Sequence, residues 1–193
     1  MSTEPLPAAF YARHTLLVAR DLLGCRLVRV LDGVTLAGTI TETEAYIGET
    51  DLACHARAGE TPRTRVMYGP PGRAYVYFTY GMHWMINAVT GEEGFPAAVL
   101  IRAVKVEEGL EIATVRRPNI KPARWADGPG KLTQCFGIGQ EQNGIDLTNT
   151  NSGLWIEASG QILDSRVTIG PRVGLYTVPE PWKSMPWRFL VSK

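Results

Sequence analysis

The chain has few of the features that would place it outside ordinary globular proteins. It contains only three cysteines, Cys25, Cys54 and Cys135, an odd number without the spacing of a metal site. No apolar run is long enough to span a bilayer, and the first ten residues lack the basic and apolar segments of a secretory signal. We therefore expect a protein of the reducing cytoplasm, without membrane segment, metal or cofactor.

The chain also lacks an excess of positive or negative residues, because its formal net charge is only +1. This balance excludes a protein that coats DNA through bulk charge, but it leaves room for a local basic patch. The stretch from His55 to His83 holds four arginines against one glutamate, Glu60. The arginines are Arg57, Arg63, Arg65 and Arg73. They form either a nucleic-acid contact or a solvated loop.

Length and patterning predict a single compact domain over residues 1–193. The hydrophobic content of 45% is ordinary, and 193 residues are enough to bury a core without disulfides. The expected strands are 25–31, 34–46, 73–79, 84–89, 99–106, 154–157, 166–169 and 189–191, and the expected helices are 16–23, 107–117 and 130–136. An irregular loop over 47–72 separates the second and third strands. The fold class is therefore α+β, with a curved, mostly antiparallel β-sheet and peripheral helices.

A single arginine, Arg102, interrupts an otherwise apolar strand-like run and needs a carboxylate or an anion to face. Alternate residues of a strand share a face, so Glu44 and Tyr46 project the same way, about 7 Å apart. If the two strands are neighbours, Arg102 keeps Glu44 ionised and can contact a phosphate. The pair is equally compatible with a plain buried ion pair. Glu42 shares the face of Glu44, so these two carboxylates are poorly placed to flank one bond as in a glycosidase.

Tyr80 lies at the expected hairpin tip, directly before Gly81, and escapes the alternation of the strands. An exposed aromatic flanked by Arg73 and His83 is a candidate wedge into a base stack, although an ordinary surface tyrosine would look the same.

An ordered series of motifs gives these residues a common setting. It runs through Glu42-Thr43-Glu44-Ala45-Tyr46, His55, Thr61-Pro62-Arg63, Tyr75-Val76-Tyr77-Phe78-Thr79-Tyr80-Gly81-Met82, Asn87, Leu100-Ile101-Arg102-Ala103, Asp127-Gly128-Pro129-Gly130-Lys131-Leu132, Pro171-Arg172-Val173-Gly174 and Pro186-Trp187-Arg188-Phe189. With this series the chain resembles the 3-methyladenine, or alkyladenine, DNA glycosylases of the alkylpurine glycosylase type. The resemblance covers nearly the whole chain, from about residue 19.

The resemblance implies a role for each matching residue. Glu44 corresponds to the general base, and Arg102 to the arginine that holds the attacking water and a phosphate. Val173 corresponds to a backbone contact to that water. The base-binding residues would be Tyr46, His55, Tyr77 and Asn87, with Asn87 screening out normal guanine. Tyr80 would fill the gap in the duplex, and Arg57, Arg63, Arg65, Arg73 and His83 are candidates for the DNA backbone.

The implied activity is monofunctional hydrolysis of an N-glycosidic bond in double-stranded DNA, without strand cleavage. The implied substrates are 3-methyladenine, 7-methylguanine, hypoxanthine and ethenoadenine, rotated out of the duplex before an abasic site is left. The near-neutral charge suggests a bacterial-type enzyme of the cytoplasm, working beside the nucleoid, and we expect it to be a monomer. Two other readings remain at this point: a non-catalytic module that stacks RNA bases on Tyr75 to Tyr80, and a metabolite hydrolase with a buried Glu–Arg pair.

Overall fold

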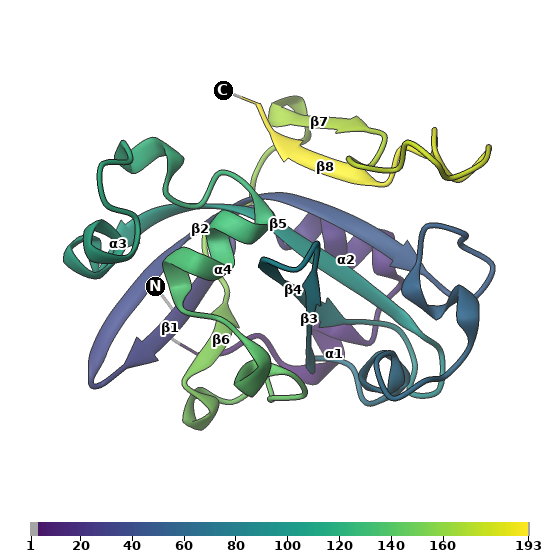
Figure 1. Cartoon of the computed structure of the whole chain (residues 1–193), viewed down its shortest axis with the longest axis horizontal. Helices are drawn as coiled ribbons and strands as arrows, with labels where there is room; N and C mark the ends of the chain where they lie inside the picture. Colours follow the sequence, from purple (N-terminus) through teal and green to yellow (C-terminus); the bar gives the residue numbers. More distant parts are fainter. Residues whose placement is uncertain (1–3, 193) are drawn as a thin grey trace.

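A computed structural model describes residues 4–192 and confirms the α+β class with a curved, mostly antiparallel sheet (Figure 1). The strands are β1 (Arg26–Leu31), β2 (Val34–Ile47), β3 (Ala74–Thr79), β4 (His83–Val89), β5 (Ala97–Glu108), β6 (Leu154–Glu157), β7 (Val167–Gly170) and β8 (Arg188–Val191). The main path runs β3-β4-β5-β2-β1-β6, and β8 pairs with both β2 and β7.

Strand β2 is the centre of this sheet. Along its first half it pairs with β1, along its second half with the short C-terminal β8, and on its other side with β5. Two register shifts flank Glu42 where β2 meets β5, so the pairing is irregular opposite Arg102. Such bulges re-aim side chains and are frequent beside functional sites.

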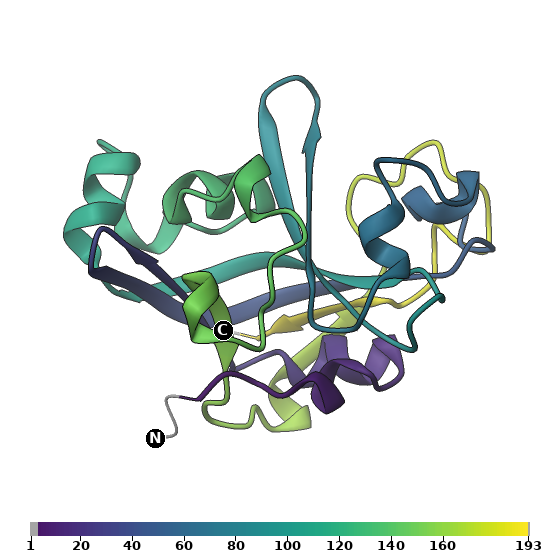
Figure 2. The ribbon, with the colours of Figure 1, turned by 90° about the horizontal axis from the view of Figure 1, so that it is seen from below.

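The helices lie on both sides of the sheet. They are α1 (Ala8–Tyr11), α2 (Thr15–Asp21), α3 (Leu110–Arg116) and α4 (Pro129–Phe136). Figure 2 shows α1 and α2 on one face of the sheet, with α3 and α4 on the other face beside the β3–β4 hairpin. Helix α4 begins with Pro129 at its first turn and ends at Gly137 in the left-handed conformation, which are the usual start and stop residues.

The hairpin of β3 and β4 stands out from the sheet between two shoulders (Figure 2). One shoulder is formed by α3 and α4, and the other by the loops 48–72 and 171–187. Tyr80 and Gly81 both have positive φ, 54° and 69°, which is the backbone of a tight hairpin turn. Tyr80 is therefore presented at the tip.

The structure differs from the sequence expectation in two places that shape the site. Strand β5 continues to Glu108, so the third helix is limited to Leu110–Arg116; Gly109 has a left-handed φ of 71° and breaks the chain between them. The expected irregular loop 47–72 contains two short 3-10 helices, η1 (His55–Ala58) and η2 (Arg65–Tyr68). Within residues 4–192 no helix combines the length and apolar character needed to cross a membrane.

Candidate active site

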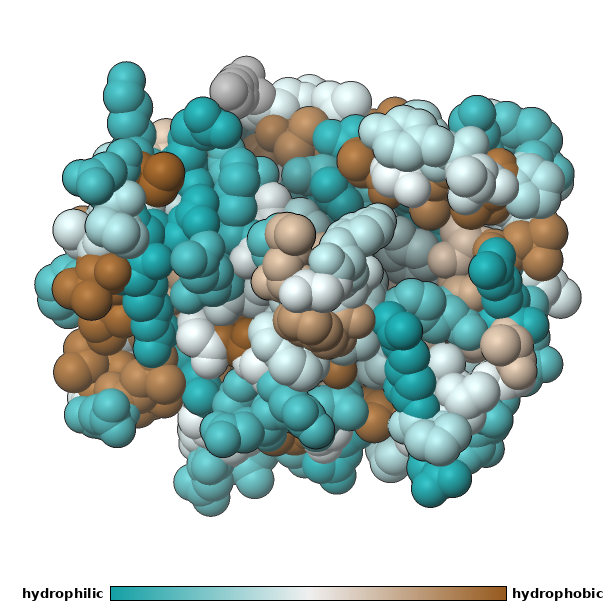
Figure 3. Space-filling view, viewed as in Figure 1, coloured by the Kyte–Doolittle hydropathy of each residue, from teal (hydrophilic) through white to brown (hydrophobic). Residues whose placement is uncertain are grey.

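A cavity of about 290 Å³ opens beside the β3–β4 hairpin, where the space-filling surface is hollowed (Figure 3). Ligand sites begin at about 300 Å³, so this volume suits one flat ring system. The lining residues are Tyr46, Ala53, Cys54, His55, Met67, Tyr75, Tyr77, Thr79, Tyr80, Met85, Asn87, Ala98, Leu100, Arg102, Pro129, Val173, Gly174 and Leu175. The predicted residues that line it are Tyr46, His55, Tyr77, Tyr80, Asn87, Arg102 and Val173, whereas Glu44 and the five predicted backbone contacts do not.

Aromatic rings from three different elements form the walls. Tyr46 comes from β2, Tyr77 from β3 and His55 from η1. The His55 ring lies edge-on to Tyr77, with centroids 4.4 Å apart. A pocket walled by rings on separate, packed elements is suited to hold a planar group by stacking.

His55 is a neutral imidazole in this setting. Burial, together with the charges of Arg63 and Arg57, lowers its pKa to about 4. Its Nδ1 lies 3.0 Å from the hydroxyl of Tyr75. Burial raises the pKa of Tyr75 to about 12, so this hydroxyl keeps its proton. The uncharged pair can offer hydrogen bonds to a base edge without adding charge to the pocket.

Glu44 lies directly behind this wall, with its side chain 0% exposed. Its Oε1 accepts a 2.7 Å hydrogen bond from the main-chain amide of Val173. Its Oε2 accepts a 2.9 Å hydrogen bond from the hydroxyl of Tyr46 and lies 3.4 Å from Nη1 of Arg102. The carboxylate is thus held by three residues that do line the cavity.

Burial raises the pKa of the Glu44 carboxyl, and three contacts oppose that rise. Arg102, the Val173 amide and the Tyr46 hydroxyl all favour the ionised form, whereas the nearby charge of Glu42 disfavours it. Burial thus disfavours the charged form of this carboxylate, while the surrounding donors favour it.

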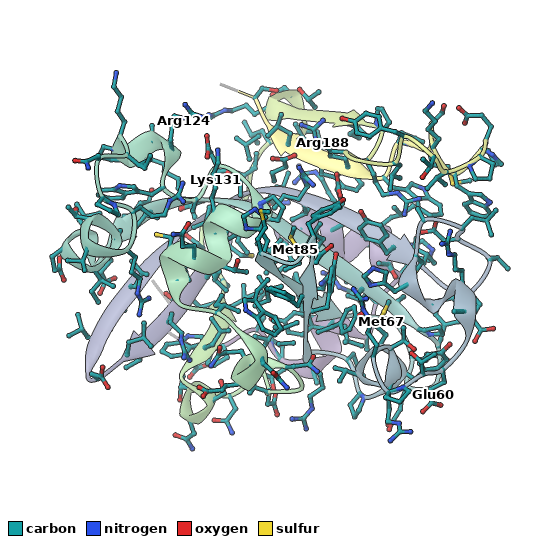
Figure 4. All side chains as sticks on the ribbon, in the orientation of Figure 1. Glu60, Met67, Met85, Arg124, Lys131 and Arg188 are labelled. Atoms are coloured by element: carbon teal, nitrogen blue, oxygen red, sulfur yellow. The ribbon has the colours of Figure 1, made fainter. Side chains whose placement is uncertain are left out.

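Arg102 contacts both carboxylates of β2, and Glu42 is the nearer partner. Nε of Arg102 lies 2.8 Å from Oε1 of Glu42, compared with 3.4 Å between Nη1 and Glu44. The same Glu42 oxygen also accepts a 2.6 Å hydrogen bond from Nε of Arg188, the first residue of β8 (Figure 4). The expected contact between Arg102 and Glu44 is present, and Glu42 fixes the guanidinium from the other side.

Asn87 and Tyr80 both lie at the cavity. Asn87 is 3% exposed on β4, lines the cavity and donates a 3.0 Å hydrogen bond to the carbonyl of Tyr75. Tyr80 is 78% exposed at the hairpin tip, at the rim of the same cavity.

The five residues predicted to contact the DNA backbone differ in their surroundings. Arg63 has its guanidinium carbon 5.3 Å from the centre of the Tyr77 ring, whereas the exposed Arg65 pairs with Glu60 at 3.1 Å. Arg57 donates to the carbonyl of Leu52. His83 begins β4 and lies against Gly130 of α4.

Of the five residues predicted to contact the DNA backbone, Arg73 lies apart from the other four. It precedes β3 at the base of the hairpin, away from the tip, and its guanidinium lies 3.8 Å from Asp146.

Sequence reasoning gave no role to several residues that build the site. Arg188 begins β8 and Arg172 lies in the loop between β7 and β8. Met67 and Met85 line the cavity from η2 and β4 (Figure 4). A motif around Arg172 was visible, but loop residues show no alternation that would reveal where a side chain points. Among residues 4–192 no cluster of three or more His, Cys, Asp or Glu side chains could hold a metal ion.

Comparison with known proteins gives the family. The family model described as "Methylpurine-DNA glycosylase (MPG)" matches residues 9–193. Curated relatives named "Putative 3-methyladenine DNA glycosylase" include one from Carboxydothermus hydrogenoformans, 45% identical over 97% of this chain and 95% of the relative. One from Methanocella arvoryzae is 48% identical over 95% of this chain and 90% of the relative. Family and geometry agree with the resemblance seen in the sequence: the chain belongs to the methylpurine-DNA glycosylase family and, as a member, is a DNA-repair hydrolase of N-glycosyl bonds.

Proposed function

We propose that the protein removes damaged purines from double-stranded DNA by hydrolysing the N-glycosidic bond with a water activated by Glu44. The observation that carries the proposal is the buried Glu44 carboxylate directly behind an aromatic cavity, held by Tyr46, Arg102 and Val173. The substrate class is alkylated and deaminated purines: 3-methyladenine, 7-methylguanine, hypoxanthine and ethenoadenine.

Access to the cavity requires that the target nucleotide leave the base stack. Rotation costs about a few kcal/mol and is least costly for damaged or mispaired bases. Stacking between Tyr46 and Tyr77 returns roughly 1–3 kcal/mol per base. The exposed ring of Tyr80 at the hairpin tip fills the space that the nucleotide leaves.

The chemical step transfers one proton and exchanges one bond. Glu44 takes a proton from water, the water oxygen forms a bond to C1′, and the bond between C1′ and the purine nitrogen breaks with its electrons going to the base. Arg102 holds the water and the adjacent phosphate. 3-Methyladenine and 7-methylguanine are cationic in the nucleotide and leave as neutral bases, whereas hypoxanthine and ethenoadenine are neutral there and take up a proton from solvent as they leave.

The set of residues around the cavity supports hydrolysis without strand cleavage. Of the described residues that line it, none is a lysine that could attack C1′ and form a Schiff base. Asn87, fixed by its hydrogen bond to Tyr75, disfavours guanine through a clash with the 2-amino group. 7-Methylguanine shares that group and is removed because its cationic ring is a better leaving group. Arg57, Arg63, Arg65 and His83 contact the DNA backbone.

The enzyme works as a monomer whose single domain spans residues 1–193, and it acts in the cytoplasm beside the nucleoid. Its affinity for DNA falls with rising salt, because backbone contacts release counterions.

A panel of duplexes tests the proposal. Each carries one lesion from the proposed class or an undamaged purine, and abasic sites are measured after incubation with the protein. Release of at least one damaged purine, with no strand break before alkali treatment, supports the proposal. No release from any of the four lesions contradicts the substrate class, and direct strand breaks contradict simple hydrolysis.

A further inference from the structure

Arg172 is a fully buried charged side chain beside the cavity, although it does not line it. Both its side chain and that of Asp51 are 0% exposed. The two form a forked pair, with Nη1 to Oδ2 at 2.5 Å and Nη2 to Oδ1 at 2.9 Å. Asp51 follows β2 and Arg172 follows β7, so the pair joins two loops that are 121 positions apart.

The same guanidinium reaches the segment that carries the site. Its Nη1 also donates a 2.9 Å hydrogen bond to the carbonyl of Ala45, the residue between Glu44 and Tyr46. Its carbon lies 4.6 Å from the centre of the Tyr46 ring and 4.9 Å from that of Trp187. Arg172 therefore contacts the Tyr46 ring from a position outside the cavity that this ring lines.

The next residue along the chain completes the connection. Val173 donates its main-chain amide to Oε1 of Glu44 at 2.7 Å. Anchoring the Arg172 side chain holds its Cα in place, so only the rotation about ψ of Arg172 is left to change where the planar peptide points the following amide. Arg172 thereby influences the position of both the Tyr46 ring and the Val173 amide that donates to Glu44.

We infer that Arg172, locked by Asp51, is a positioning residue that sets the Tyr46 ring and the Val173 amide for base capture and for the ionisation of Glu44. The inference rests on the proposed function for its catalytic consequence. A lysine could not replace the arginine, because a single ammonium lacks the planar fork that serves Asp51, Ala45 and the carbonyl of Trp182 together.

A stabilising role alone does not account for this pair. Buried ion pairs are often matched or exceeded in stability by apolar residues of similar volume, whereas removal of one partner leaves an uncompensated charge. The double variant Arg172→Met/Asp51→Leu separates the two roles, because it removes both charges and keeps the volume. The matched control is Arg26→Met/Glu157→Leu, an ion pair of 2.7 Å between β1 and β6, away from the cavity.

The first measurement is hydrogen exchange of the Val173 amide, followed by NMR in the full-length protein. We expect exchange at least about tenfold faster in the Arg172→Met/Asp51→Leu variant than in wild type, and unchanged exchange in the control. This measurement does not depend on catalysis. Unchanged exchange of the Val173 amide in the site variant overturns the inference.

The second measurement is the pH dependence of single-turnover release of 7-methylguanine. Glu44 faces Arg102, Tyr46, Glu42 and the Val173 amide, and loss of that amide as a donor raises the pKa of its carboxyl. The acid limb of the profile should then move up by about one pH unit in the site variant and stay in place in the control. A wild-type acid limb in the site variant contradicts the inference.

The double variant could fail to fold, or the wild-type protein could release no damaged purine, and a measurement decides the inference in each case. If the double variant lacks a cooperative unfolding transition, Arg172→Lys keeps the charge opposite Asp51, and the same exchange and pH changes are expected of it; their absence there overturns the inference. If wild type releases no damaged purine, the proposed function fails, and the exchange measurement still decides whether Arg172 positions Val173.

Discussion

The main-chain amide of Val173 and the carboxylate of Glu44 are joined by a hydrogen bond of 2.7 Å across 129 positions of sequence. This bond fixes one oxygen of the proposed base from a loop, while Tyr46 and Arg102 hold the other oxygen from the sheet. The carboxylate therefore has a defined orientation before any substrate enters, as general-base catalysis requires.

Replacement of the proposed base should separate binding from chemistry. Glu44→Gln keeps the shape of the side chain but cannot accept a proton, so we expect single-turnover base release to fall about 10²–10⁴-fold. Binding to a duplex with the lesion should stay within about threefold of wild type, measured by fluorescence anisotropy. Wild-type turnover in this variant would exclude Glu44 as the base.

Shortening the hairpin tip should affect duplex substrates selectively. Tyr80 is 78% exposed and contributes no core packing, so Tyr80→Ser should leave the melting temperature unchanged. We expect base release from duplex DNA to fall at least about tenfold, because the vacated space is no longer filled. Release from single-stranded DNA, which needs no such filling, should change less than about twofold. Equal losses on both substrates would contradict a wedge.

The shared carboxylate of Glu42 should matter for both stability and activity. Glu42→Gln leaves Arg102 and Arg188 without their common anion, and we expect a loss of about 2–4 kcal/mol in the free energy of unfolding, measured in urea. Base release should fall as well, because Arg102 is no longer fixed from its far side.

Glu157→Gln is the matched control for this change. Its side chain is 5% exposed and pairs with Arg26 at the other edge of the sheet, so it should lower stability without changing base release in urea-free buffer. Parallel losses of activity in the two variants would assign the effect of Glu42 to stability alone.

The buried imidazole of His55 should make the protein sensitive to acid. Its pKa falls from 6.5 to about 4 on folding, so the unfolded chain binds the proton more readily. The stability that the neutral form provides is complete above about pH 6.5 and is lost as the pH falls toward 4. His55→Gln should show a smaller drop in melting temperature between pH 7.5 and pH 5 than wild type. His83→Gln, at an exposed position outside the cavity, serves as the control, and an identical drop in all three proteins would contradict the assignment.

Strand alternation predicted much of this site because it needs only local regularity. Glu44 and Tyr46 were expected on one side of a strand, and their 2.9 Å hydrogen bond is the direct result. The partner of Arg102 was harder to predict, because two register shifts around Glu42 change which side chains meet across β2 and β5. A bulge of this kind depends on the pairing of two strands and leaves no periodic trace in either one.

Loop residues were the least predictable part. Arg172 lies where no alternation or helical spacing applies, and its contacts come from Asp51, Tyr46 and Trp187, which are distant in sequence or belong to other loops. Arg73 shows that closeness in sequence can also mislead. It lies near Tyr80 in sequence but at the other end of the hairpin, beside Asp146. Such placements follow from the packing of whole elements.

The order in which the site is translated has a consequence for timing in the cell. Glu44, Tyr46 and Arg102 leave the ribosome early, but the amide that holds Glu44 belongs to residue 173, and Arg188 closes on Glu42 only when β8 joins β2. A chain that stops before residue 173 therefore carries the proposed base without the amide that holds one of its two oxygens. The proposed site is complete only once residue 188 has been translated.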